Sequence, residues 1–124
     1  MPKFRVWLTD IDQMLRMKAL VFEKDKTRCV CGYSFDFYLE DENATIMQST
    51  GLVDKNGKEI FEGDIVRMAK DVYSEPTYYE VARHRGGAYR LESKQHGCEL
   101  WLRHTDCEVV GNVYENREFL EDKQ

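Results

Sequence analysis

The chain lacks the features that mark membrane-bound, secreted and multidomain proteins. None of its apolar runs approaches the roughly 20 residues that a membrane-spanning helix needs. Its first residues alternate between polar and apolar side chains and contain no hydrophobic region of a signal peptide. Only two prolines occur, Pro2 and Pro76, and no linker rich in serine and glycine divides the chain. We therefore expect a cytoplasmic protein with one domain over residues 1–124 and no membrane partner.

The chain also has no excess of positive charge. Its formal net charge is −5 and its isoelectric point is about 5.2. Binding to nucleic acid or to an anionic membrane depends on clustered lysine and arginine, so this balance works against both as general activities. With 42% hydrophobic residues, the 124 residues suffice for a hydrophobic core of their own.

Common catalytic motifs are absent. Gly51 and the pair Gly57-Lys58 superficially resemble a phosphate-binding loop, but that loop has four residues between its glycines and Ser or Thr after the lysine. Here five residues intervene, and Glu59 places negative charge where phosphate would lie. The three histidines, His84, His96 and His104, form no HExxH motif. The sequence therefore predicts a non-enzymatic protein with no catalytic residues and no cofactor.

The spacing of the four cysteines argues against a metal site. Cys29 and Cys31 fall on one face of a strand, and with Cys98 and Cys107 they are a candidate four-thiolate zinc site. Neither pair has the usual spacing of two to four residues between paired ligands. We expect four small hydrophobic side chains in or near the core, no metal ligand, and no disulfide in a reducing compartment.

A cysteine nucleophile with a histidine base stays open as an alternative. Cys98 with His96 or His104, and Cys107 with His104, are the pairs that the fold would have to bring together. A thiol- or metal-dependent enzyme is therefore a third, weaker hypothesis for the function.

Most of the chain has the pattern of short strands. Residues 4–8, 20–22 and 35–39 are apolar or alternating runs of strand length. Residues 12–20 show some helical spacing through Met14, Leu15 and Met17, which is too little to predict a helix. Residues 23–26 and 40–43 are charged loops. Many short strands with glycine turns predict a mainly β fold, a small antiparallel barrel or sandwich-like domain with several sheets.

Turns and a final helix complete the predicted architecture. The Asn56-Gly57 pair is the strongest reversal signal, because both residues adopt positive φ at low cost. Residues 79–83 and 88–92 predict a β-hairpin around Gly86 and Gly87. Residues 108–114 predict a strand whose glycine marks a bulge or a bend at a barrel corner. Asn116 is a favoured N-cap and predicts a short C-terminal helix docked by the apolar pair that follows it.

Two stretches carry a family resemblance. Residues 50–66 contain Thr50-Gly51-Leu52, Asp54-Lys55-Asn56-Gly57-Lys58-Glu59-Ile60 and Glu62-Gly63-Asp64-Ile65-Val66, and the C-terminal stretch contains Gly111-Asn112-Val113-Tyr114-Glu115-Asn116. Together with residues 3–7 they resemble the YopX family of small proteins encoded by bacteriophages and prophages. The resemblance implies a mostly β domain with barrel-like and sandwich-like features. It implies no activity, because the family has no established biochemical function.

We assign the signature residues a structural role. Asp64 follows a turn glycine, and such an aspartate usually accepts hydrogen bonds from nearby backbone N–H groups. The signature positions are Thr50, Gly51, Leu52, Asp54, Asn56, Gly57, Ile60, Gly63, Asp64, Gly111, Asn112, Tyr114 and Asn116.

Two hypotheses for the function follow. The first is a non-enzymatic protein-binding or regulatory module with a host or phage protein as partner, and self-association is a further way for a small sheet protein to protect its edges. The second is nucleic-acid binding through the basic hairpin of residues 83–90. There arginine and tyrosine would contact phosphate and stack on an unpaired base. The contact residues of this alternative are Arg83, Arg85, Tyr89 and Arg90.

Overall fold

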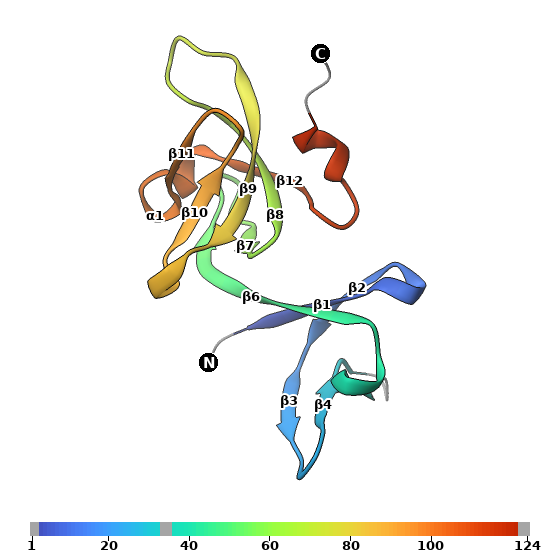
Figure 1. Cartoon of the computed structure of the whole chain (residues 1–124). Helices are drawn as coiled ribbons and strands as arrows, with labels where there is room; N and C mark the ends of the chain where they lie inside the picture. Colours follow the sequence, from blue (N-terminus) through green and yellow to red (C-terminus); the bar gives the residue numbers. More distant parts are fainter. Residues whose placement is uncertain (1–2, 33–35, 122–124) are drawn as a thin grey trace. The chain divides into compact units, whose positions relative to one another are not determined.

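The computed structural model describes residues 3–32 and 36–121, so residue 35 of the predicted strand 35–39 lies outside the described residues. The chain forms two compact units, residues 1–49 and residues 50–124, each described by itself below. The strands of the described residues belong to three sheets, with the orders β2-β1-β6-β7, β3-β4-β5 and β11-β10-β9-β8-β12. The predicted fold class, mainly antiparallel β with several sheets and a short helix near the C-terminus, is confirmed (Figure 1). A single domain over residues 1–124 stays a prediction.

The first unit is built on two small sheets. Its elements are β1 (Phe4–Leu8), the 3₁₀ turn η1 (Thr9–Ile11), β2 (Gln13–Met17), β3 (Ala19–Phe22), β4 (Thr27–Val30), β5 (Asp36–Tyr38), the 3₁₀ turn η2 (Leu39–Asp41) and the first part of β6 (Ala44–Val53). Residues 13–17 are a strand because they pair along their whole length with β1, which decides against their helical spacing. Val6, Leu8, Cys29 and Phe37 form the core of this unit.

The second unit contains the largest sheet. Its elements are the end of β6, β7 (Glu59–Phe61), β8 (Asp64–Ala69), β9 (Pro76–Arg83), η3 (Arg85–Gly87), β10 (Tyr89–Glu92), β11 (Gly97–Glu99), α1 (Leu100–Arg103), η4 (His104–Asp106), β12 (Glu108–Asn112) and η5 (Arg117–Leu120). Alternating residues of β8, β9 and β10 point into a core that includes Val66, Tyr79, Val81 and Leu91. Leu100 anchors α1 in the same core.

The predicted hairpin and bulge are confirmed. β9 and β10 pair in register around η3, where Gly86 and Gly87 have φ of +85° and +88°. In β12 the register against β8 shifts between Val109 and Gly111, as a bulge requires. The C-terminal helix η5 is a single 3₁₀ turn. Its Phe119 ring stacks against the Tyr78 ring, with ring centroids 4.8 Å apart.

The predicted role of Asn116 needs a correction. Asn116 occupies the N-cap position of η5, but its side chain makes no capping hydrogen bond there. Its Oδ1 instead accepts from the Asn112 N–H at 3.2 Å, four residues back. The backbone carbonyl of Asn116 supports η5 by accepting from the Phe119 N–H at 3.0 Å. The side chain therefore closes the turn between β12 and η5.

None of the helices in the part of the chain that the structure describes is long and apolar enough to cross a bilayer.

Candidate functional site

The turn of the central signature is organised by one buried carboxylate. Asp54 is only 3% exposed, and its Oδ1 accepts from the N–H groups of Asn56 and Lys58, both at 2.9 Å. Its Oδ2 accepts from the Val109 N–H at 2.8 Å. Burial alone would raise the pKa of Asp54, but these backbone hydrogen bonds hold the pKa below its usual value. Asp54 therefore joins its own turn to β12 as an ionised structural group.

The second signature carboxylate also serves the backbone. Asp64 is 2% exposed, and its Oδ2 accepts from the Phe61 N–H at 2.8 Å, which is the local hydrogen bond that the sequence predicts. Gly63, with φ of +87°, donates its N–H to the Val81 carbonyl and accepts from the Val113 N–H, both at 2.9 Å. The Glu62-Gly63-Asp64 turn thus touches both β9 and the C-terminal signature.

The C-terminal signature is a compact hydrogen-bonded turn. Asn112 Oδ1 accepts from the N–H groups of Tyr114 at 3.0 Å and Glu115 at 2.9 Å. The Asn116 N–H donates to the Asn112 carbonyl at 2.8 Å. A Cβ built on Gly111 would lie within 2.8 Å of the Asn116 Cβ, so glycine is required where the bulge meets this turn.

The remaining signature residues complete the same structural unit. Thr50 Oγ1 donates to the Ile60 carbonyl at 2.7 Å and accepts from the Leu52 N–H at 3.2 Å. Ile60 is fully buried. Gly51 and Gly57 have φ of +79° and +81°, which other residues rarely adopt. The two signature stretches therefore meet in the second unit and hold β12 in place.

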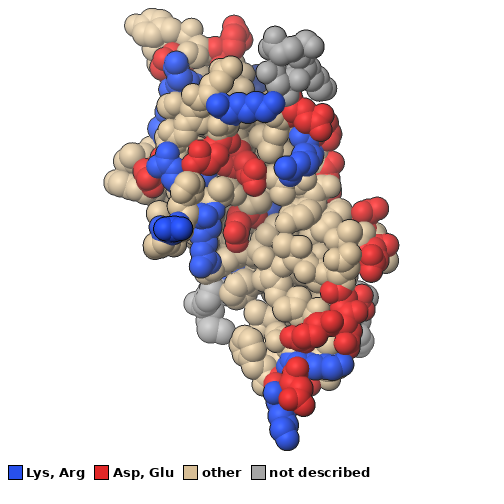
Figure 2. Space-filling model, viewed as in Figure 1, with Lys and Arg blue, Asp and Glu red and all other residues tan. Residues whose placement is uncertain are grey.

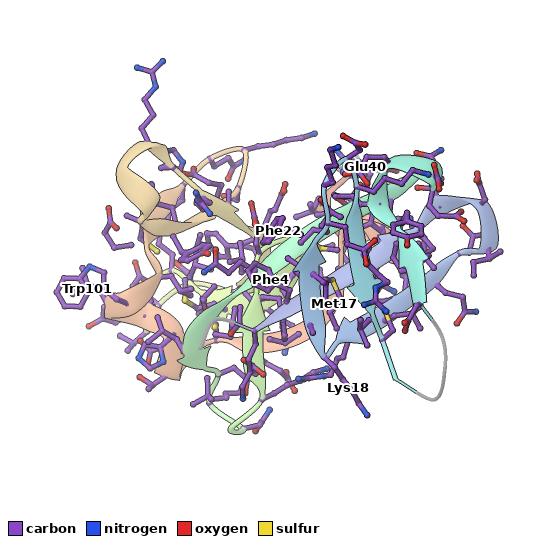
Figure 3. The ribbon with its side chains drawn as sticks, turned by 90° about the horizontal axis from the view of Figure 1, so that it is seen from below. Phe4, Met17, Lys18, Phe22, Glu40 and Trp101 are labelled. Atoms are coloured by element: carbon purple, nitrogen blue, oxygen red, sulfur yellow. The ribbon has the colours of Figure 1, made fainter. Side chains whose placement is uncertain are left out.

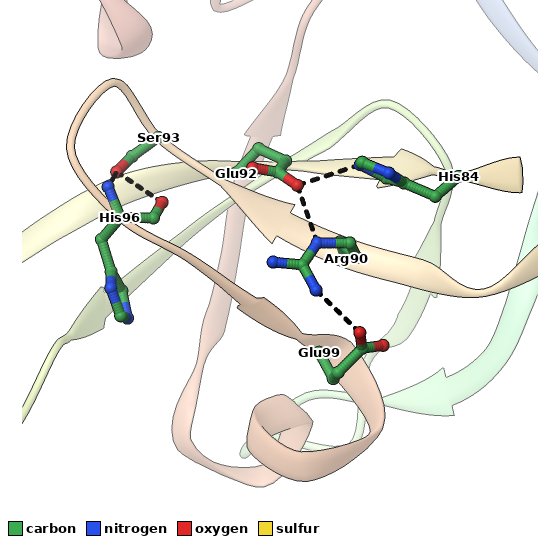
Figure 4. A network of polar contacts seen from close by, with 6 residues as sticks. All are labelled: His84, Arg90, Glu92, Ser93, His96 and Glu99. Carbon is green, nitrogen blue, oxygen red and sulfur yellow. Dashed lines mark hydrogen bonds and ion pairs between the residues drawn. The ribbon is translucent and has the colours of Figure 1, made fainter.

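Among the four candidate contact residues of the basic hairpin, Arg90 forms ion pairs within its own sheet. Arg90 Nε lies 2.9 Å from Glu92 Oε1, and its Nη1 lies 2.7 Å from Glu99 Oε1 (Figure 4). His84 Nε2 lies 3.0 Å from the same Glu92 oxygen. The hydrogen bonds that Arg90 donates to Glu92 and Glu99 raise the pKa of Arg90, and the one to Glu92 lowers the pKa of Glu92. Arg90 is therefore paired with two carboxylates of its own sheet.

The other three candidate residues lie on the same hairpin. Arg83 ends β9, Arg85 lies in the exposed turn, and Tyr89 begins β10 opposite Arg83. Figure 2 shows acidic and basic side chains interleaved on the face in view. Nucleic-acid contact at Arg83, Arg85, Tyr89 and Arg90 stays a prediction.

The four cysteines fall in different units. Cys29 and Cys31 belong to the first unit, and Cys98 and Cys107 to the second. Over residues 3–32 and 36–121, no group of three or more His, Cys, Asp or Glu side chains is arranged to hold a metal ion. Cys107 Sγ donates to the His104 backbone carbonyl at 3.3 Å. The imidazole of His104 does not take part in this contact. Burial raises the pKa of Cys107 to about 12 and that of Cys29 to about 11.

We expect the buried thiols to be inert in the folded chain. Because a thiolate is the reacting species, a raised pKa and full burial both slow the reaction of Cys29 and Cys107 with a disulfide reagent such as DTNB. Cys31 and Cys98 are partly exposed and should be labelled first, with all four reacting in denaturant. Time-resolved labelling with peptide mass mapping measures this order. Labelling of Cys107 as fast as Cys98 would contradict it.

An open groove of about 730 Å³ lies on the second unit. Its lining comes from the β8–β9 loop, the start of β9, the β10–β11 turn and η5. Its lining includes the stacked rings of Tyr78 and Phe119 and charged side chains of both signs. The mixed lining suits a polar chain with apolar side groups better than a small apolar ligand.

Large apolar side chains are exposed on two segments of the second unit. Val72 and Tyr73, in the loop between β8 and β9, are 90% and 94% exposed. Trp101 and Leu102, on α1, are 65% and 58% exposed, and Trp101 points away from the ribbon (Figure 3). The exposure of these four side chains could not be predicted from the sequence, because neither segment differs in composition from a partly buried one.

Hydrogen bonds fix the backbone beneath these side chains. Asp71 Oδ1 accepts from the Tyr73 N–H at 2.9 Å and from the Ser74 hydroxyl at 2.8 Å. The hydroxyl hydrogen bond is the largest cause that lowers the pKa of Asp71. Arg103 donates to the carbonyls of Ala69 at 3.0 Å and Lys70 at 3.3 Å, which ties α1 to the base of the loop.

Comparisons with known proteins give a family and a fold. A family model described as YopX protein matches residues 3–121. The crystal structure of protein EF1440 from Enterococcus faecalis is similar over 98% of this chain and 99% of that chain, with 29% identity and a TM-score of 0.65. The crystal structure of protein yopX from Bacillus subtilis, a structural genomics target, is similar over 96% and 98%, with 22% identity and a TM-score of 0.67. No curated protein matches the chain.

Proposed function

Since this chain belongs to the YopX protein family, we propose that it is a phage- or prophage-encoded, non-enzymatic module that binds another protein in the bacterial cytoplasm. The observation that supports this proposal is the exposure of Val72 and Tyr73 in the β8–β9 loop and of Trp101 and Leu102 on α1.

The composition of the two segments is that of a protein interface. Exposed aromatic side chains are costly in water, and Trp, Tyr and Arg dominate the residues that carry binding energy between proteins. The Asp71 turn and the Arg103 hydrogen bonds hold both segments before any partner arrives. Such preorganisation reduces the entropy lost on association. The partner is a host or phage protein, and a second copy of the chain is the alternative.

We expect the double variant Tyr73→Ala, Trp101→Ala to lose the partner. Each truncation removes a large exposed ring, and loss of two interface anchors weakens binding by about 30-fold or more. Pull-down from cells that carry the phage, with quantitative mass spectrometry, compares the variant with the wild-type chain. Phe22→Ala is the matched control, because Phe22 is 81% exposed but lies in the first unit.

Two outcomes would count against the proposal. Recovery of the bait alone under several growth conditions removes the host or phage partner, and sedimentation of the purified chain then tests a second copy. A specifically recovered protein that binds the double variant as well as the wild type places the interface elsewhere.

A further inference from the structure

Strand β9 extends beyond the end of β10, its neighbour on one side. β10 pairs with β9 only over Glu80–Arg83, with Glu92 opposite Glu80 as the last pair. β8 pairs with β9 farther, as far as Pro76 opposite Ala69. Residues 76–79 of β9 therefore have a neighbouring strand on one side only.

The backbone direction at these residues follows from the hydrogen-bond register. His84 donates its N–H to the Ala88 carbonyl on the β10 side, whereas the Val81 carbonyl accepts from Gly63 on the β8 side. Backbone groups alternate between the two sides of a strand, so even-numbered residues of β9 point toward β10. Tyr78 N–H and C=O, together with the Pro76 C=O, thus point to the side that β10 has left. Among the described residues, no strand lies beside them there.

The turn after β10 is held away from this open edge. Ser93 donates its N–H and its hydroxyl to the His96 carbonyl, both at 2.9 Å. Its Oγ accepts from the His96 N–H at 3.0 Å (Figure 4). These hydrogen bonds direct the chain into β11 instead of along β9. The groove of about 730 Å³ lies where the missing strand would be, because its lining includes Thr77, Tyr78 and Tyr79 as well as the 93–96 turn.

From this geometry we infer that the groove accepts an extended segment of the protein partner as an added strand beside residues 76–79 of β9. The inference rests on the proposed function and names the way in which the partner is bound. The segment accepts from the Tyr78 N–H and donates to the carbonyls of Tyr78 and Pro76. Its residue opposite Tyr78 is large and apolar, since cross-strand contact with an aromatic ring stabilises such a pair. The Phe119 ring, stacked on Tyr78, supports that contact from behind.

Hydrogen exchange of the free chain tests the open edge itself. The Tyr78 amide should exchange about 100-fold faster than the amides of Tyr79 and Val81, which point toward β8. Two-dimensional NMR in deuterated buffer resolves the three amides. Equal protection of Tyr78 and Tyr79 overturns the inference, because the edge would then already be paired.

Peptides test the added strand without a known partner. A display library of seven-residue peptides is selected against the immobilised full-length chain, and the binders are made synthetically. Tyr78→Pro removes the ring and the outward N–H, whereas Tyr78→Ala removes only the ring. We expect tenfold or greater weakening with Tyr78→Pro and a smaller effect with Tyr78→Ala. N-methylation along the peptide should abolish binding at alternate amides only.

The outcomes separate this inference from the proposed function. A selection without binders, binding that ignores Tyr78→Pro, or N-methylation without alternation overturns the added strand. The dependence of pull-down on Tyr73 and Trp101 is measured independently, so the protein-binding proposal can stand when the strand fails. Binders that require Tyr78 support the strand even when Tyr73 and Trp101 prove dispensable.

Discussion

Asp54→Ala should destabilise the chain by about 3–5 kcal/mol. The substitution removes the acceptor of three backbone hydrogen bonds, two within the turn and one to Val109 in β12. Hydrogen bonds to a charged acceptor contribute about 1.5–3 kcal/mol each, and they are not additive when they share one group. The partly buried N–H groups left without this partner add to the loss. Urea unfolding at pH 7, followed by tryptophan fluorescence, measures the change.

The exposed Asp71 provides a matched control for this prediction. Asp71 organises a similar turn by accepting from Tyr73 N–H and the Ser74 hydroxyl, but it is exposed to water. Asp71→Ala should therefore change stability little, because water replaces the lost acceptor. Equal effects of Asp54→Ala and Asp71→Ala would show that burial and the link to β12 do not matter.

The effect of Asp54 should also depend on pH. Because the pKa of Asp54 is lowered in the folded chain, its ionised form stabilises the fold at every pH above the unfolded value of about 3.9. That stabilisation is lost as pH falls through the lower folded pKa. The difference in unfolding free energy between wild type and Asp54→Ala should therefore narrow below about pH 4. A difference that stays constant down to pH 2 would contradict this assignment.

Gly111→Ala should destabilise the chain by about 2–4 kcal/mol through a steric clash. The new methyl group would lie within 2.8 Å of the Asn116 Cβ, which cannot move without its backbone. Separation of the two residues breaks the hydrogen bond from Asn112 N–H to Asn116 Oδ1. Overpacking of this kind costs about 1–3 kcal/mol, and the lost hydrogen bond adds about 1 kcal/mol. Urea unfolding again measures the change.

A second substitution identifies the clash as the cause. Asn116→Gly removes the opposing side chain, so Gly111→Ala should cost far less in that background, and the double-mutant cycle gives the coupling. Gly86→Ala is the control for glycine replacement without a clash. Gly86 has φ of +85° and nothing within 4 Å of an added Cβ, so its replacement should cost about 1 kcal/mol. Additive effects of Gly111→Ala and Asn116→Gly would refute the steric explanation.

The sequence predicted those parts of the fold that depend on neighbouring residues. The Asn56-Gly57 turn and the hairpin at Gly86 rest on the positive φ that glycine adopts, and the bulge near Gly111 rests on the missing Cβ of glycine. The hydrogen bond of Asp64 to a nearby backbone N–H was also predictable, since its partner Phe61 is three residues away.

Features that depend on distant residues could not be predicted. Nothing near Asp54 in the sequence indicates that Val109 will donate to it. The pairing of Arg90 with Glu99 in the next strand depends on where β10 ends, which the sequence does not determine locally. Asn116 has the sequence of an N-cap, but the bulge at Gly111 brings its side chain to Asn112 instead. The exposure of Tyr73 and Trp101 depends on how distant elements pack, and local composition does not indicate that packing.

The link between Asp54 and Val109 also bears on the order in which the second unit forms. The two residues are 55 positions apart, so the buried carboxylate has only part of its hydrogen bonds until residues 107–109 have left the ribosome. The Lys55 N–H likewise awaits the carbonyl of Cys107. Closure of such a long loop is entropically slow, and it completes the unit only once its last strand is available. A nascent chain that ends before β12 would therefore lack both contacts, and we expect its second unit to be less stable than that of the full chain.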